Sequence, residues 1–215
     1  MPVNEAEAAK WFLQAAEQGD ASAQGQIGFC YASGKGVTKN TEAGLDWLRK
    51  SAAQKDSSSQ YMLGLLYEGR MGVTQDFQAA AAWCRQSADN GYLEAQLHMG
   101  QIHIAGRGVP QDYAAAAGWY HKAADQGSAE AELQLGVMYV KGQGLTQDYV
   151  AARAWYEKFA AHGSSTAMLN LGELAAQGKG GPPDFKRAVE WYERAVELDD
   201  PRAMFNLARL QATGK

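Results

Sequence analysis

Tryptophan recurs in this chain at a fixed interval, and that interval constrains the fold more than any other feature. Successive tryptophans are 36 residues apart, at Trp11, Trp47, Trp83, Trp119, Trp155 and Trp191. A constant period of this length is typical of an array of structural repeats rather than of one compact core. The 215-residue chain therefore contains about six copies of one unit.

Glycine and helix-capping residues follow the same period. Two glycine columns repeat, one at Gly28, Gly64, Gly100, Gly136 and Gly172 and one at Gly36, Gly72, Gly108, Gly144 and Gly180. A third column holds Asn40, Asp76, Asp112, Asp148 and Asp184. Glycine inside a helix costs roughly 0.5–1 kcal/mol, so the 24 glycines of the chain need a structural role. The shared period accounts for many of them, because each glycine column occupies a fixed place in the repeat.

One unit reads as two helices joined by a glycine turn. Between 131 and 139, Ala131, Leu135 and Met138 follow the spacing of a helix with one buried stripe. The segment 141–144 contains two glycines that can close this first helix and turn the chain. Asp148 can then cap a second helix, whose apolar positions are Ala152, Trp155, Tyr156 and Phe159 and which ends near Gly163.

Short helices of this kind bury their apolar stripes only by stacking on neighbouring units. The sequence therefore predicts an all-α fold, a right-handed superhelical solenoid of about twelve antiparallel helices. The chain should begin with a second helix, continue with five complete pairs and end with a first helix, from about Glu5 to about Ala212. Asp200-Pro201 reads as the N-cap and first residue of that last helix.

The repeated residues resemble those of Sel1-like repeats, which belong to the tetratricopeptide-like superfamily. The segment from 100 to 127 carries the pattern at Gly100, Gly106, Gly108, Asp112, Ala116, Trp119, Tyr120, Ala123, Ala124 and Gly127. The resemblance covers nearly the whole chain and implies a bacterial repeat protein that acts as a scaffold or adaptor. We place a half repeat at 5–22, full repeats at 23–58, 59–94, 95–130, 131–166 and 167–202, and a half repeat at 203–215.

A few residues depart from the repeat, and they predict local changes in the turns. Arg70 and Met71 stand where a turn glycine is usual, and Lys55 replaces the glycine after a second helix. The fifth repeat carries Gly181-Pro182-Pro183 in its turn, and its first helix has Ala175 in place of a tyrosine.

Residues that vary between repeats should mark the surface that is free to bind. In a stacked array the first helices line the concave face, and their variable positions fall on one side of the helix. We predict that this groove binds a peptide or protein segment, with amide side chains holding its backbone and apolar ones forming pockets. The predicted residues are Gln26, Phe29, Met62, Leu65, His98, Gln101, Gln134, Val137, Asn170, Glu173 and Asn206. The alternative is a solvated inner wall without a ligand.

Other candidate sites have simpler structural interpretations. The tryptophan column lies in the expected buried stripe and predicts core packing. His98 and His103 do not share a helix face, so we expect no metal site there. Cys84 stands where other repeats have tyrosine and reads as a small buried group. Cys30 and Cys84 should lie on helices that do not touch, so we expect no disulfide and a reducing compartment.

Composition and motifs exclude several function classes. A net charge of −4 with scattered Lys and Arg argues against nucleic acid as a partner. Residues 1–10 are polar and acidic and no apolar run is long enough to cross a bilayer, so we expect no membrane insertion. The chain as given reads as cytoplasmic, or as periplasmic or secreted if a signal peptide has been removed. We also find no nucleotide, zinc or hydrolase motif, and none of the Ser-x-x-Lys type of β-lactamase-like hydrolases, and so predict no enzymatic activity and no cofactor.

The two ends support a second interpretation. The first half repeat shows Trp11, Phe12 and Leu13, and the last shows Phe205, Leu207 and Leu210. Terminal repeats normally carry polar caps, and these do not. The chain could therefore be part of a longer array, or a structural spacer that associates end to end or through its convex surface.

Overall fold

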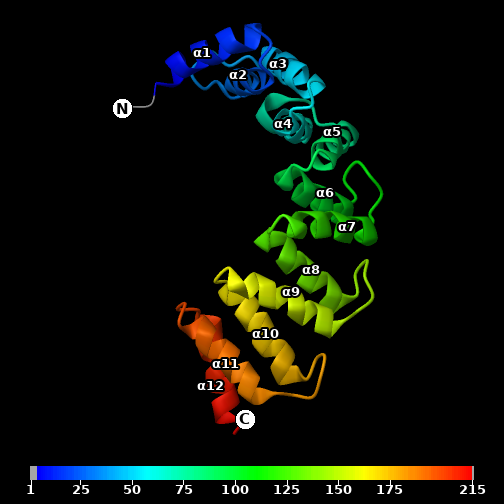
Figure 1. Ribbon diagram of the computed structural model, residues 1–215, viewed down its shortest axis with the longest axis vertical. Helices are drawn as coiled ribbons and strands as arrows, with labels where there is room; N and C mark the ends of the chain where they lie inside the picture. Colours follow the sequence, from blue (N-terminus) through cyan, green and yellow to red (C-terminus); the bar gives the residue numbers. More distant parts are fainter. Residues whose placement is uncertain (1–3, 215) are drawn as a thin grey trace. The chain divides into compact units, whose positions relative to one another are not determined.

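The computed structural model describes residues 4–214, and the regular structure in this range is entirely helical. Within residues 4–112 and within residues 113–214, consecutive helices lie side by side as antiparallel neighbours joined by short turns (Figure 1). The chain divides into two compact units, Met1–Asp112 and Tyr113–Lys215. Within residues 4–214 there are twelve α-helices, which begin and end at the residues expected from the repeat, Glu5 and Ala212.

The first unit contains six α-helices and one short 3₁₀ turn. They are α1 (Glu5–Glu17), α2 (Ala21–Ser33), α3 (Thr41–Ala53), α4 (Ser57–Tyr67), η1 (Arg70–Gly72), α5 (Phe77–Asp89) and α6 (Leu93–Ala105). The second unit contains α7 (Tyr113–Asp125), α8 (Ala129–Lys141), α9 (Tyr149–Ala161), α10 (Ser165–Gln177), α11 (Phe185–Val196) and α12 (Pro201–Ala212). Even-numbered helices are the first helices of the repeats, and odd-numbered helices are the second.

The predicted caps begin the second helices. Asn40 accepts a hydrogen bond from the Ala43 amide at 3.1 Å, and Asp148 accepts one from the Ala151 amide at 3.0 Å. Asp184 caps α11 in the same way at 2.9 Å. Each cap satisfies a backbone N–H that has no partner inside the helix. Asp200 and Pro201 also begin α12 as expected.

The second turn glycine lets neighbouring repeats approach closely. A Cβ built on Gly108 would overlap the backbone of Phe77, at the start of α5. A Cβ on Gly144 would overlap the backbone of Tyr113, at the start of α7. Both glycines also have positive φ, at 71° and 70°. Gly108 and Gly144 are therefore glycine for two reasons, backbone conformation and packing.

The tryptophan prediction was wrong in part. Only Trp119 is buried, at 7% exposure, whereas Trp11 is 60% exposed and the other four are half-buried. The next residue along the helix takes the buried position, as Leu48, Tyr120 and Tyr192 do. The tryptophan ring thus lies at the edge of the stripe, and in four repeats a cation three residues later covers it. These pairs are Lys50 on Trp47, Lys122 on Trp119, Lys158 on Trp155 and Arg194 on Trp191, at 4.0–4.4 Å from the ring centroid.

The turn after α4 differs from the others, as the missing glycine predicted. Gly69 takes the left-handed conformation one residue before the usual position, and α4 ends early at Tyr67. Arg70–Gly72 then forms a 3₁₀ turn in which Met71 has φ 55°. Lys55 likewise occupies a left-handed glycine position, with φ 66°. Met71 and Lys55 are strained because a side chain disfavours positive φ.

Both cysteines are buried and free, and Cys84 is the small buried group that the sequence predicts. Cys84 is fully buried against α4, where a Cβ on Gly64 would overlap its sulfur. Burial raises the pKa of the Cys84 thiol to about 12.

Candidate functional site

The predicted binding residues lie outside the hydrophobic interior in both units. In the first unit, Gln26 and Gln101 are exposed, whereas Phe29, Met62, Leu65 and His98 are half-buried. In the second unit, Glu173 is exposed, and Gln134, Val137, Asn170 and Asn206 are half-buried. The buried stripes of the same helices belong to other residues, such as Ile27, Leu63 and Leu135. The variable columns therefore remain accessible to a ligand.

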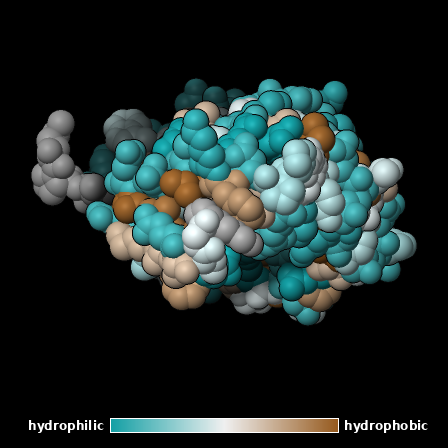
Figure 2. Space-filling model, turned by 90° about the horizontal axis from the view of Figure 1, so that it is seen from below, coloured by the Kyte–Doolittle hydropathy of each residue, from teal (hydrophilic) through white to brown (hydrophobic). Residues whose placement is uncertain are grey.

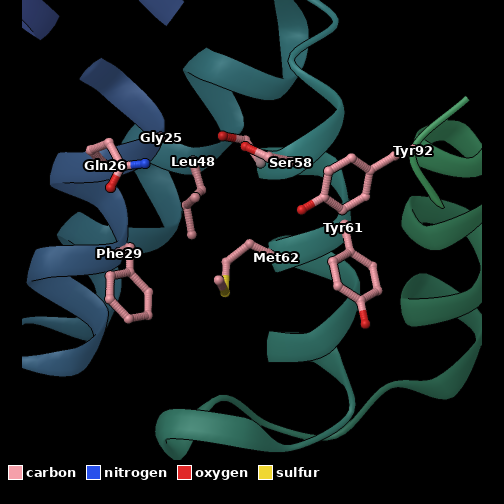
Figure 3. A pocket seen from close by; sticks show the side chains of 9 residues that line it. Gly25, Gln26, Phe29, Leu48, Ser58, Tyr61, Met62 and Tyr92 are labelled. Atoms are coloured by element: carbon pink, nitrogen blue, oxygen red, sulfur yellow. The ribbon is translucent and has the colours of Figure 1, made fainter. Parts of the chain in front are cut away.

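Three of the predicted residues meet around one hollow in the first unit. Gln26 and Phe29 of α2 and Met62 of α4 line a space of about 300 Å³ (Figure 3). In Figure 3 the Met62 side chain lies between Phe29 and the ring of Tyr61. The remaining lining residues are Gly25, Leu48, Ser58, Ser59, Tyr61 and Tyr92. No charged side chain lines this hollow, so it is suited to an uncharged, largely apolar group.

Two tyrosines that the sequence prediction missed form one side of this hollow. The rings of Tyr61 and Tyr92 are 5.5 Å apart at their centroids and tilted by 48°. Burial raises the pKa of Tyr61 to about 12. Burial, followed by the charge of Glu94, also raises the pKa of Tyr92. Both phenols therefore stay protonated near neutral pH and can donate a hydrogen bond.

Tyr92 occupies a position that other repeats use to cap a helix. The same column holds Asp20, Asp56, Ser128, Ser164 and Asp200, whose side chains accept from the first turn of the next helix. Tyr92 makes no such hydrogen bond at the start of α6. Loss of a cap costs about 1 kcal/mol. The replacement of a capping residue by Tyr92 was the sequence signal that could have located the hollow.

Gly25 lies at the same hollow and is also locally unfavourable. It lies inside α2, where glycine costs roughly 0.5–1 kcal/mol. A Cβ at this position would overlap the Ser59 hydroxyl, which accepts a hydrogen bond from Ser51 at 2.8 Å. Two unfavourable residues, Gly25 and Tyr92, thus converge on one hollow. Departures from local preference are expected at functional sites.

His98 is held by a carboxylate and does not face a ligand freely. Its Nε2 lies 2.7 Å from Glu68 Oε1, and its Nδ1 lies 3.3 Å from the side-chain oxygen of Gln101. Both partners of the Glu68 pair are nearly buried, with side-chain exposures of 13% and 10%. Glu68 stands in a column that is otherwise Ala32, Ile104, Val140 and Ala176. A carboxylate at a position that is apolar in the other repeats was the sequence signal that could have revealed the pair of Glu68 and His98.

His103 is separate from His98 and lies in the interior. Its ring nitrogens have no hydrogen-bond partner, and burial, followed by the charge of Arg85, lowers the pKa of the imidazole. Over the described range 4–214, no group of three or more His, Cys, Asp or Glu side chains is arranged to hold a metal ion.

In the second unit, the face is more charged. Asn170 and Glu173 share a hollow of about 170 Å³ with Val140, Tyr156, Leu174 and Lys179. Gln134, Val137 and Asn206 do not line it. Burial, followed by the charge of Glu173, raises the pKa of Tyr156 to about 12. The predicted residues thus line an uncharged hollow in the first unit and a charged hollow in the second.

None of the helices between residues 4 and 214 combines the length and the apolar character that a bilayer crossing requires.

Comparison with known protein families matches consecutive segments of the chain to one repeat family. The Sel1 repeat profile matches residues 1–20, 21–56, 57–92, 93–128, 129–164, 165–200 and 201–215. No match is found among curated proteins.

Several solved structures resemble this one. A protective antigen of uropathogenic Escherichia coli with an SLR fold is 33% identical with a TM-score of 0.88, and the match covers 98% of this chain and 45% of the antigen. This chain therefore spans less than half of that protein. A Sel1 repeat protein from Oxalobacter formigenes is 32% identical with a TM-score of 0.74, covering 97% of this chain and 85% of the other. A sel1 repeat protein from Klebsiella pneumoniae shares the fold at 20% identity and a TM-score of 0.51, over 94% and 99% of the two chains.

Proposed function

Because the chain belongs to the Sel1 repeat family, which commonly mediates protein–protein interactions, we propose that it binds a protein segment on the exposed face of α2, α4 and α6. The segment is a peptide or a loop of a partner, and one uncharged apolar side chain of it enters the hollow between α2 and α4. Gln26, Ser58 and the two tyrosine hydroxyls then hydrogen-bond to its backbone.

The hollow of about 300 Å³ between α2 and α4 carries this proposal. It gathers three residues that vary between repeats, and its walls contain aromatic and methionine side chains. Such side chains are enriched where interfaces derive most of their binding energy. Its two locally unfavourable residues, Gly25 and Tyr92, are explained if the hollow has been retained for binding.

Selection of peptides from a displayed library against the intact chain tests this function. Peptides that bind the wild-type chain should bind Met62→Asp and Phe29→Ala at least about tenfold more weakly, because a central interface residue contributes about 2 kcal/mol or more. Gln86→Ala, an exposed change on α5, serves as the matched control and should leave binding unchanged. Circular dichroism checks that each variant is folded. Selected peptides that bind all three variants with equal affinity would exclude this face as the binding site.

A second candidate function is association through the ends of the array. Trp11 on α1 is 60% exposed, and Phe205 and Met204 on α12 are 68% and 44% exposed. Figure 2, which views the molecule from below, shows brown apolar residues interrupting a mostly polar surface. A contiguous patch of exposed apolar side chains is typical of a surface that binds another protein, and Met204 and Phe205 are adjacent in the sequence.

Sedimentation over a range of concentrations tests this second function. The wild-type chain should associate as its concentration rises, and Trp11→Gln combined with Phe205→Gln should remain a monomer. A wild-type chain that is monomeric at every concentration would exclude self-association through these residues.

A further inference from the structure

A second hollow lies in the second unit, beside the turn that joins α10 to α11. It has a volume of about 240 Å³. Its apolar lining residues include Leu171, Leu174, Ala175 and the half-buried ring of Trp191. Charged side chains also line it, so this hollow differs in chemistry from the uncharged one between α2 and α4.

The hollow exists where this repeat lacks an aromatic side chain. Ala175 occupies the column that holds Tyr31, Tyr67, His103 and Tyr139 in the other repeats. Tyr67 illustrates the usual role of that residue, since it is half-buried and its hydroxyl accepts a hydrogen bond from Arg49 at 2.9 Å. Alanine ends at Cβ and leaves the space of the ring open.

Two basic side chains enter the same place. Arg153 stands in a column that is otherwise Ala9, Leu45, Ala81, Ala117 and Val189. Arg187 stands in a column that holds alanine at Ala43, Ala79, Ala115 and Ala151. Both line the hollow, together with Lys179. The hollow therefore combines an alanine in place of a ring with two guanidinium groups, one from each of two adjacent repeats.

The charges around the hollow leave a net positive site. Arg187 is paired with Glu157 at 2.7 Å, and Asp184 caps the Arg187 amide at 2.9 Å. Arg153 makes no ion pair in the described part of the chain, and Lys179 lies over the ring of Tyr149, 5.5 Å from its centroid. Three cations against two carboxylates leave one net positive charge, which matches a monoanion better than a doubly charged phosphate.

From these contacts we infer that the hollow beside the α10–α11 turn binds a carboxylate attached to an apolar, ring-sized group. The ring occupies the space that Ala175 leaves open, against Trp191 and Leu174. The carboxylate faces Arg153, whose planar guanidinium can donate two parallel hydrogen bonds to it. This site is independent of the proposed peptide face, because it lies in the other unit and shares no residue with it.

An NMR titration of the intact chain, following the Trp191 indole N–H, tests the inference with 3-phenylpropionate as the probe. Saturable binding with a Kd on the order of 1 mM is expected for a ligand of this size. The neutral 3-phenylpropanamide should bind at least about tenfold more weakly, because an unpaired guanidinium loses its charged hydrogen bonds. The peptide Gly-Gly-Phe, with a free or an amidated C-terminus, distinguishes a chain terminus from a small organic acid as the source of the carboxylate.

Two variants use residues that other repeats already carry and should therefore fold. Ala175→Tyr refills the space and should abolish binding, and Arg153→Ala should weaken binding of the acid at least about tenfold. Lys186→Ala removes an exposed cation outside the hollow and should leave the affinity unchanged. The inference is overturned if neither carboxylate saturates the wild-type chain at about 10 mM, well above the expected Kd, or if Ala175→Tyr and Arg153→Ala bind like wild type.

Discussion

Glycine inside α8 and α10, the first helices of two repeats, is fixed by the side chain packed against it. A Cβ on Gly136 would overlap the ring of Tyr156, and a Cβ on Gly172 would overlap the ring of Tyr192. Glycine is unfavourable in a helix, so its recurrence here reflects the close approach of two helices. We predict that Gly136→Ala destabilises the protein by about 1–3 kcal/mol, the usual range for overpacking. Urea denaturation monitored by circular dichroism measures the change.

Gly118 provides the matched control for this prediction. It also lies inside a helix of the second unit, but it is exposed and a Cβ there would meet nothing within 4 Å. Gly118→Ala should therefore stabilise the protein, by about 0.5–1 kcal/mol. Equal effects of the two substitutions would mean that contact with Tyr156 does not determine the glycine column.

The thiol of Cys84 should be inert in the folded protein. Its side chain is fully buried, and burial, followed by the charge of Glu68, raises the pKa of the thiol to about 12. The thiolate is the reactive form, so a thiol reagent should modify Cys84 only when the chain opens. Cys30→Ala isolates this thiol for measurement with a colorimetric thiol reagent.

Cys30, whose exposed fraction is 8%, provides the comparison for the reactivity of Cys84. In Cys84→Ala the remaining thiol should react faster than Cys84 does in Cys30→Ala. The opposite order of rates would contradict the assignment of Cys84 to the closed interior.

At the scale of the helix, the start of α6 combines a structural weakness with a wall of the proposed site. Tyr92 replaces the capping residue found in the other repeats, and no side-chain cap is present. Tyr92→Asp should restore the cap and stabilise the protein by about 1 kcal/mol. The same change should weaken binding of any peptide selected on the face of α2, α4 and α6, because it removes one wall of the hollow.

Asp20→Ala is the reciprocal control, since Asp20 accepts a hydrogen bond from the Ala23 amide at 2.7 Å. It should destabilise the protein by about 1 kcal/mol. Thermal unfolding and peptide affinity, measured on the same variants, separate stability from binding. A Tyr92→Asp chain that is no more stable than wild type would show that the position does not act as a cap.

The helices were predictable because each is specified by local signals that recur. Asn40, Asp148 and Pro201 mark helix starts, and the glycine column from Gly36 to Gly180 marks turns, so the order of helices follows from single residues and their period. For the turn after α4, the sequence predicted only that its geometry would differ from that of the other turns. Its geometry depends on Gly69 taking the left-handed conformation early and on Met71 tolerating it, which no periodicity specifies.

The proposed binding face was predictable as a set of columns, but not as a cavity. Gln26, Phe29 and Met62 came from comparing repeats, whereas Tyr61 and Tyr92 stand in columns that otherwise serve packing and capping. Which side chains meet depends on the spacing between adjacent helices, and that spacing is set by pairs such as Gly25 and Ser59. The prediction that the tryptophans pack in the core failed for a related reason. Sequence spacing does not distinguish the edge of a helix's apolar stripe from its centre. The repeat boundaries and the ligand remain predictions.

At the scale of the whole molecule, each unit buries tyrosine hydroxyl or cysteine thiol groups whose ionisation makes the free energy of unfolding sensitive to high pH. Burial raises the pKa to about 12 for Tyr61 and Cys84 in the first unit and for Tyr120 and Tyr156 in the second. An unfolded tyrosine ionises near pH 10. Between about pH 10 and about pH 12 the folded protein therefore holds protons that the unfolded chain has released. Stability is fully present below this window and is lost as the pH rises through it.

We therefore predict that the Tm is nearly constant up to about pH 9, the ordinary pKa of a thiol, and falls steeply above about pH 10. Replacing Tyr120 and Tyr156 together by phenylalanine keeps both rings and removes both ionising hydroxyls. The double variant should lose less Tm than wild type over the same pH range, because fewer protons are released on unfolding. Thermal melts followed by circular dichroism measure both curves. If the two fall in parallel, ionisation of Tyr120 and Tyr156 does not drive the alkaline loss. Ionisation of Tyr61 and Cys84 and the net negative charge of the chain are then the remaining causes, and added salt would screen only the net charge.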